Sequence, residues 1–166
     1  WDLGLELAQA VRTLPGVIEF AAQDLSGFTA LLDARRLCGS RLLHQQMTVQ
    51  LRAATLWPPA EFLRAKVDER DERHGRHADT AHNLEPNLKN GRGALRDLQT
   101  ARWIAKRCFG VERWLDMYER GLLEKDEARR LVRAEAWLSD LRFALHVVSG
   151  RREERVLFDH QPALAQ

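Results

Sequence analysis

Residues 126–149, which read DEARRLVRAEAWLSDLRFALHVVS, decide the fold class of this chain. The apolar residues of this stretch recur at alternating spacings of three and four positions, so they share one side of an α-helix. They are Leu131, Ala134, Leu138, Leu141, Leu145 and Val148. An apolar stripe that runs unbroken along a helix of this length is typical of a helical bundle. Gly150 is expected to end the helix.

Other segments with helical periodicity lie on both sides of this stretch. We expect helices over residues 17–37, 41–54, 59–73 and 95–109, with short helical pieces over 111–120 and 156–165. The N-terminus differs, because Leu3, Leu5 and Leu7 alternate with other residues in the period of a strand. The predicted fold is mostly α: an irregular bundle of about six or seven helices with a strand remnant at its N-terminus.

Composition limits the classes of partner and the compartment. The 166 residues are 45% hydrophobic and 30% charged, which is typical of a soluble globular protein. The net charge of +2 comes from 26 basic and 24 acidic residues, a balance that argues against nucleic acid or an anionic membrane as partner. Cys38 and Cys108 have no metal-binding or disulfide-framework spacing, and no transmembrane run is present, so a reducing cytoplasm is expected.

Residues 83–106, NLEPNLKNGRGALRDLQTARWIAK, are the candidate functional segment. Lys89 and Arg92 lie among glycines, and Arg96 falls in the first turn of the following predicted helix. Cations, a glycine-rich main chain and a helix N-terminus together suit the binding of an anion. The residues alone leave a second interpretation open, in which the loop is a solvated basic connection whose glycines and asparagines only form turns.

Two further groups of residues have less specific patterns. His74, His77, Asp79 and His82 could form a metal cluster, although their place at a charged helix end equally suits a solvated surface. The tryptophans at 57, 103, 114 and 137 are predicted to pack in the interior or between helices.

The candidate segment resembles the signature of the bacterial PII uridylyltransferase/uridylyl-removing enzymes, whose pattern is roughly NLEPN-K-GxGGLRDLQT. Other stretches agree in order along nearly the whole chain. WDLGLE at residues 1–6 resembles a strand of that family, and LDARRL at 32–37, LRFALH at 141–146 and LFDHQ at 157–161 resemble its later motifs.

The resemblance implies a domain arrangement and a reaction. Members of that family begin with a nucleotidyltransferase domain of the DNA polymerase beta superfamily, followed by a helical domain, an HD-type hydrolase domain and regulatory domains. Residues 1–13 would then be the last strand or strands of the nucleotidyltransferase domain, and residues 14–166 the helical domain. The implied reaction transfers UMP from UTP to a tyrosine of a PII signalling protein with Mg²⁺, in nitrogen regulation.

The resemblance also implies roles for individual residues. Asp2 would be the catalytic carboxylate of the later strand and a Mg²⁺ ligand. Asn87, Lys89, Arg92 and Arg96 would contact the phosphates of the substrate or hold the loop that does.

Several features depart from the family pattern. Ala94 replaces the second glycine of the loop, and His82 replaces an aromatic residue. The Gly-Gly turn, the Asp-x-Asp pair and the HD motif are absent from these 166 residues, so we expect the isolated chain to be inactive. Two other hypotheses remain: a sibling nucleotidyltransferase with another acceptor, and a helical interaction or sensor module without catalysis.

Overall fold

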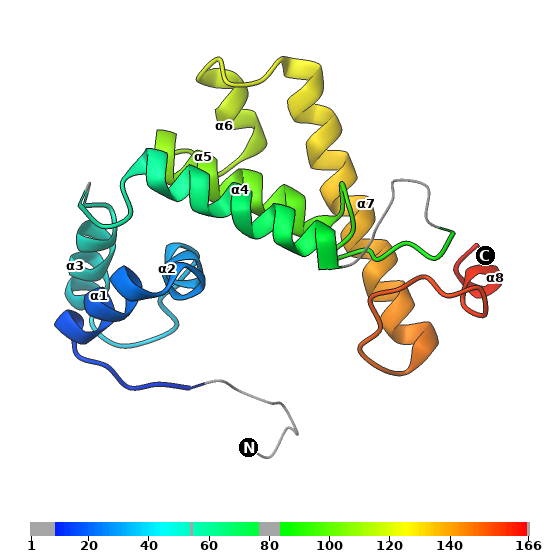
Figure 1. Cartoon of the computed structure of the whole chain (residues 1–166), viewed down its shortest axis with the longest axis horizontal. Helices are drawn as coiled ribbons and strands as arrows, with labels where there is room; N and C mark the ends of the chain where they lie inside the picture. Colours follow the sequence, from blue (N-terminus) through cyan, green and yellow to red (C-terminus); the bar gives the residue numbers. More distant parts are fainter. Residues whose placement is uncertain (1–8, 54, 77–83, 166) are drawn as a thin grey trace. The chain divides into compact units, whose positions relative to one another are not determined.

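The computed structural model describes residues 9–53, 55–76 and 84–165, and over this part of the chain the protein is helical (Figure 1). Its helices are α1 (Leu14–Gln23), α2 (Leu25–Leu32), α3 (Arg41–Leu51), α4 (Pro59–Arg76), α5 (Leu95–Phe109), α6 (Trp114–Glu119), α7 (Lys125–Ser149) and α8 (Gln161–Leu164). The mostly-α prediction is therefore confirmed.

The predicted strand remnant is not supported. Residues 1–8, which include Asp2, lie outside the described residues, and residues 9–13 adopt no regular secondary structure. Within the described part of the chain the β-type pairing is a single antiparallel bridge between Asn87 and Arg155.

The chain divides into two compact units between Pro58 and Pro59. In the first unit α1, α2 and α3 pack on one another around Ala21, Phe28 and Leu51, which are buried. The indole of Trp57 stacks on Phe28 and its Nε1–H donates a hydrogen bond of 2.7 Å to the carbonyl of Ala21. The predicted boundary between residues 13 and 14 stays a prediction.

The single helix predicted for residues 17–37 is wrong, because the chain changes direction at Asp24. This residue has an extended backbone with a ψ of 112°, and its carboxylate accepts a hydrogen bond from the Ser26 N–H at 3.0 Å. An aspartate that accepts in this way is a strong N-cap, so one helix ends and another begins there. The second of them ends at Leu32, five residues earlier than expected.

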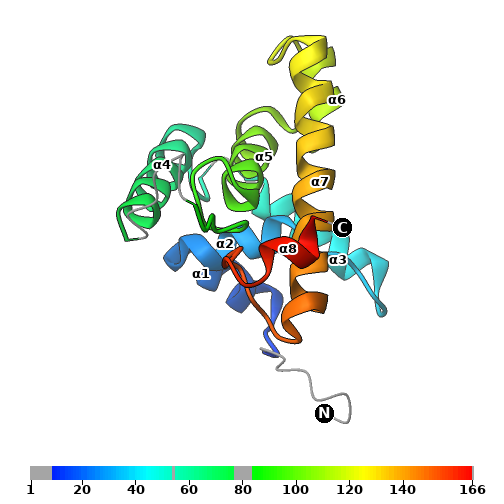
Figure 2. The same cartoon turned by 90° about the vertical axis from the view of Figure 1, so that its right-hand side faces the viewer.

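In the second unit α5 packs against both α4 and α7, and α6 lies beside the first half of α7 (Figures 1 and 2). The core where α5, α6 and α7 meet contains Ala105, Val111, Trp114, Met117 and Ala128. A second core lies at the other end of α7, where Leu145 packs with Leu88 and Val156. Helix α7 therefore holds two separate cores together.

Helix α7 follows its predicted stripe at four of the six positions and departs from it at Ala134 and Val148. Glu127 accepts a hydrogen bond of 2.9 Å from the Glu124 N–H and caps the helix start. Leu131, Leu138, Leu141 and Leu145 belong to the two cores, whereas Ala134 and Val148 are exposed. Trp137 is 63% exposed, so the prediction that it packs in the interior is wrong.

Candidate functional site

The candidate segment consists of a loop, described over residues 84–94, and most of α5, and the loop is fixed to the chain that follows α7. The Leu88 N–H donates to the Glu154 carbonyl at 2.8 Å, and the Val156 N–H donates to the Pro86 carbonyl at 3.0 Å. The Leu88 side chain is buried against Leu145 and Val156. Two backbone hydrogen bonds and an apolar anchor therefore hold the loop in a defined place.

The main chain of the loop is satisfied internally, which differs from the expected anion cradle. The Oδ1 atom of Asn87 accepts hydrogen bonds from the Lys89 N–H at 3.0 Å and the Asn90 N–H at 2.7 Å. The Leu95 N–H donates to the Leu88 carbonyl, and the Arg96 N–H donates to the Lys89 carbonyl at 2.8 Å. These N–H groups already have acceptors, so an anion at this corner would be bound mainly by side chains.

Asp97 holds the corner between α4 and α5. Its carboxylate lies 2.7 Å from Nη2 of Arg73, within 3.2 Å of Nε2 of His74, and accepts a hydrogen bond of 2.7 Å from the Gly93 N–H. Arg73 also donates to the Asn90 carbonyl at 3.3 Å. Burial raises the pKa of Asp97, but the hydrogen bonds from Arg73 and Gly93 and the charges of Arg73 and His74 outweigh it, and the net pKa is lowered.

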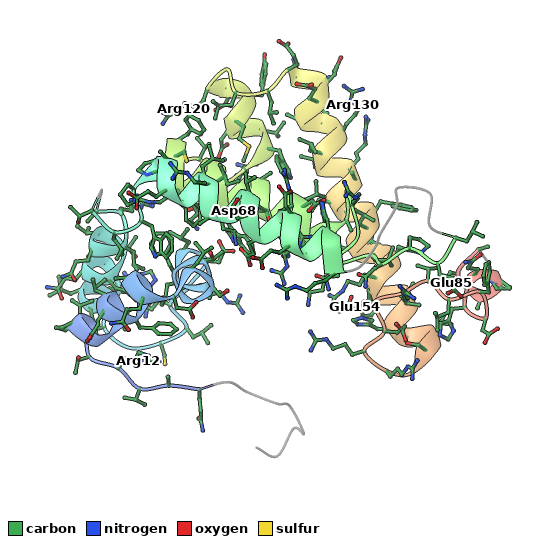
Figure 3. All side chains as sticks on the ribbon, in the orientation of Figure 1. Arg12, Asp68, Glu85, Arg120, Arg130 and Glu154 are labelled. Atoms are coloured by element: carbon green, nitrogen blue, oxygen red, sulfur yellow. The ribbon has the colours of Figure 1, made fainter. Side chains whose placement is uncertain are left out.

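Glu154, labelled in Figure 3, forms a second charged centre next to the loop. Both of its carboxylate oxygens accept hydrogen bonds of 2.6 Å from Arg142 of α7. The hydrogen bonds from Arg142 lower the pKa of Glu154 more than burial raises it. The ammonium of Lys89 lies 4.0 Å from the same carboxylate. Lys89, a predicted substrate contact, is therefore half-buried and already faces an anion.

Arg96 lies beside a buried lysine of α4. The guanidinium carbon of Arg96 lies 5.5 Å from the centroid of the Trp103 ring, and the ammonium nitrogen of Lys66 lies 4.7 Å from the same centroid. Both are cation–π distances. Lys66 is only 2% exposed and is paired with Glu69. Burial lowers the pKa of Lys66, partly offset by Glu69, and the nearby charges of Arg96 and Arg73 lower it further.

Four of the five predicted site residues therefore come together at one corner of the second unit. Asn87 forms the turn, Lys89 faces Glu154, Arg96 lies on Trp103, and the Arg92 side chain is exposed. The fifth, Asp2, lies outside the described residues.

Sequence reasoning missed the side chains that build this corner. They are Lys66, Arg73, Asp97, Arg142 and Glu154. Lys66 and Arg142 lie in the middle of predicted helices, Arg73 and Asp97 near helix ends, and Glu154 in a charged turn. Charge alone does not distinguish these residues from many surface residues. The resulting corner carries more cationic than anionic side chains, and it can attract a phosphate or carboxylate through its side chains.

The predicted histidine cluster receives no structural support as a metal site. His77, Asp79 and His82 lie outside the described residues, and His74 contacts Asp97. Over residues 9–53, 55–76 and 84–165 no group of three or more histidine, cysteine or acidic side chains is placed to hold a metal ion.

Comparison with known proteins now identifies the family. The family model described as GlnD PII-uridylyltransferase matches residues 61–166, which is nearly all of the second unit. The chain is 42% identical over 166 residues to the bifunctional uridylyltransferase/uridylyl-removing enzyme of Photobacterium profundum, and 41% identical over the same length to those of Pseudomonas aeruginosa and Nitrosococcus oceani. All three matches cover 100% of this chain.

The chain belongs to the GlnD PII-uridylyltransferase family. It spans 18% to 19% of the length of the three relatives named above. No solved structure matches the chain. In the described part of the chain, no helix has the length and apolar character needed to cross a membrane.

Proposed function

We propose that this chain is the helical part of a cytoplasmic enzyme that transfers UMP from UTP to a tyrosine of a PII signalling protein. One observation carries the proposal: the family match covers the unit in which a fixed loop gathers cationic side chains beside α4 and α5. The free thiols Cys38 and Cys108 agree with a reducing compartment.

The cationic corner supports binding of the phosphates of UTP through side chains. Arg92 is exposed, and Arg96 is held near the loop by its ring contact with Trp103. Arginine suits this role because its planar guanidinium can donate two hydrogen bonds to one phosphate. Lys89 and Asn87 would act mostly by holding the loop: the Lys89 ammonium faces Glu154, and the Asn87 side chain accepts hydrogen bonds from the main chain.

Catalysis in the proposed enzyme needs groups beyond this unit. Asp2 would be a ligand of Mg²⁺, which would neutralise charge on the triphosphate when bound. Because the remaining carboxylates of that site are absent from these 166 residues, the isolated chain is proposed to transfer no UMP.

The test uses a longer chain that contains the complete nucleotidyltransferase domain and measures labelled UMP transferred from UTP to a PII protein. Arg92→Ala should raise KM for UTP about tenfold, the effect of one charge-assisted hydrogen bond. Asp2→Asn should abolish transfer, and a PII protein whose acceptor tyrosine is phenylalanine should accept nothing.

Arg120→Ala is the matched control, because Arg120 is an exposed arginine at the end of α6 (Figure 3). It should leave KM unchanged. Equal KM values for the Arg92 and Arg120 variants would contradict the phosphate contact. Transfer to an acceptor other than a PII protein would favour the sibling nucleotidyltransferase, and the absence of transfer to any acceptor would favour the non-catalytic module.

A further inference from the structure

Helix α7 carries a second apolar stripe, on a side that none of the predicted core residues occupies. Neighbouring residues of this stripe are about one or two helical turns apart, so all of them fall within an arc of about 60° around the helix. They are Val132, Ala136, Phe143 and Val147. Val132 is 42% exposed, Phe143 72% and Val147 66%. An exposed row of this kind, in which Ser139 occupies the turn between Ala136 and Phe143, is typical of a surface that binds another element.

Helix α6 lies beside α7 at the N-terminal end of this stripe (Figure 1). A pocket lies between side chains of these two helices. Its volume is about 470 Å³, enough for a bulky side chain and its neighbours. Val132 and Ala136 of the stripe form one wall, and Trp114 and Leu115 of α6 form the other. The stripe and the pocket therefore make one apolar surface.

Among the described side chains, one cation in the lining of the pocket has no partner. Glu135 lies 2.9 Å from Arg102 and accepts a hydrogen bond of 2.7 Å from Nε1 of Trp114, so these three side chains satisfy one another. Arg113 also lines the pocket and is exposed, and within the described part of the chain its guanidinium has no hydrogen bond or ion pair. The surface is therefore complementary to an apolar partner that carries a carboxylate at this end.

We propose that this surface binds an amphipathic helix of the longer polypeptide, with a bulky apolar side chain in the pocket and a carboxylate opposite Arg113. The spacing of the stripe matches the apolar face of a helix that packs along α7. The helix is supplied by the same polypeptide, because this chain spans only 19% of the Photobacterium profundum relative. The proposal depends on family membership and is independent of the substrate proposed above.

The first test measures the rate at which a cysteine in the stripe reacts with a maleimide, read at that residue by peptide mass spectrometry. Phe143→Cys should react quickly in the 166-residue chain and at least tenfold more slowly in the full-length protein. Arg130→Cys is the matched control, because Arg130 is exposed on another side of α7 (Figure 3) and should react at the same rate in both.

Equal rates for Phe143→Cys in the two chains would overturn the proposal. Slow reaction in the 166-residue chain itself, together with a dimeric mass by light scattering, would also overturn it, because a second copy would then be the occupant. Circular dichroism of each variant would verify that the helices are intact.

The second test addresses the proposed carboxylate. In the full-length protein with Phe143→Cys, the added change Arg113→Glu should speed the maleimide reaction several-fold, because two carboxylates would then repel each other. Arg120→Glu, at an exposed arginine that does not line the pocket, should leave the rate unchanged. An unchanged rate with Arg113→Glu would overturn the assignment of an acidic partner.

Discussion

The Arg73 guanidinium lies 2.7 Å from the Asp97 carboxylate and joins the last turns of α4 to the first turn of α5. The side chains are 13% and 20% exposed, so water screens this pair less than it screens a surface pair. Because the same carboxylate accepts the Gly93 N–H, the pair also fixes the loop that carries the candidate site.

Replacing Asp97 should therefore destabilise the second unit. Asp97→Asn keeps the size of the side chain but leaves Arg73 without its counter-ion and weakens the bond from Gly93. We expect the free energy of unfolding to fall by about 2 kcal/mol. Urea denaturation followed by circular dichroism measures the change.

The control for this variant is Glu72→Gln. Glu72 pairs with Arg76 at 2.9 Å on the same helix, but both side chains are more than two-thirds exposed, at 68% and 74%. Such pairs contribute at most about 0.5 kcal/mol. Equal losses in the two variants would contradict the role assigned to Asp97.

The contribution of Asp97 should depend on pH. Its pKa is lowered in the folded state, so the unfolded state binds protons at higher pH than the folded state does. The stabilisation is complete above the unfolded pKa, about 3.9, and is lost as the pH falls through the lower folded value. The difference in unfolding free energy between the wild type and Asp97→Asn should therefore shrink as the pH falls from about 5 to below about 4. A difference that grew on acidification would refute this assignment.

The helices could be predicted because their signals are local. The apolar stripe of α7 and the stop signals at Gly110 and Gly150 were sufficient to place α5 and α7 within a few residues. The break at Asp24 was missed although the signal was present, since an aspartate can cap a helix inside a run that still has helical spacing.

The candidate site was only partly predictable, because its contacts join distant segments. The loop was recognisable from its glycines and cations, but its anchors are Glu154, which lies 65 residues after Lys89 in the numbering, and Arg73 of α4. The hydrogen bonds that Asn87 accepts from the Lys89 and Asn90 N–H groups are local, and they agree with the interpretation in which the asparagines of the loop form turns. The pairings with Glu154 and Arg73, by contrast, depend on tertiary packing.

Two glycines of the second unit should respond oppositely to alanine. Gly93 has a φ of 73°, a left-handed conformation that disfavours a side chain, although a Cβ there would meet no atom within 4 Å. Gly93→Ala should therefore cost about 1 kcal/mol. Gly75 lies in α4, and a Cβ there also meets nothing, so Gly75→Ala should stabilise by about 0.5 kcal/mol. Thermal denaturation of both variants tests the pair, and a shift of the same sign in both would contradict the conformational explanation.

The geometry of the Arg142–Glu154 pair should matter more than its charge. Arg142 donates two hydrogen bonds of 2.6 Å to the two oxygens of Glu154, and these hydrogen bonds raise the pKa of Arg142. Arg142→Lys keeps the charge, but lysine cannot form this bidentate pair, so we expect the free energy of unfolding to fall by about 1 kcal/mol.

Arg151→Lys is the matched control. Arg151 is 67% exposed and donates one hydrogen bond of 2.8 Å to Glu153, so this change should alter the free energy of unfolding by less than about 0.5 kcal/mol. Hydrogen exchange at the Leu88 N–H, which donates to the Glu154 carbonyl, gives a local measure: Arg142→Lys should speed this exchange, and Arg151→Lys should not. Unchanged exchange in the Arg142 variant would show that the loop is held without this ion pair.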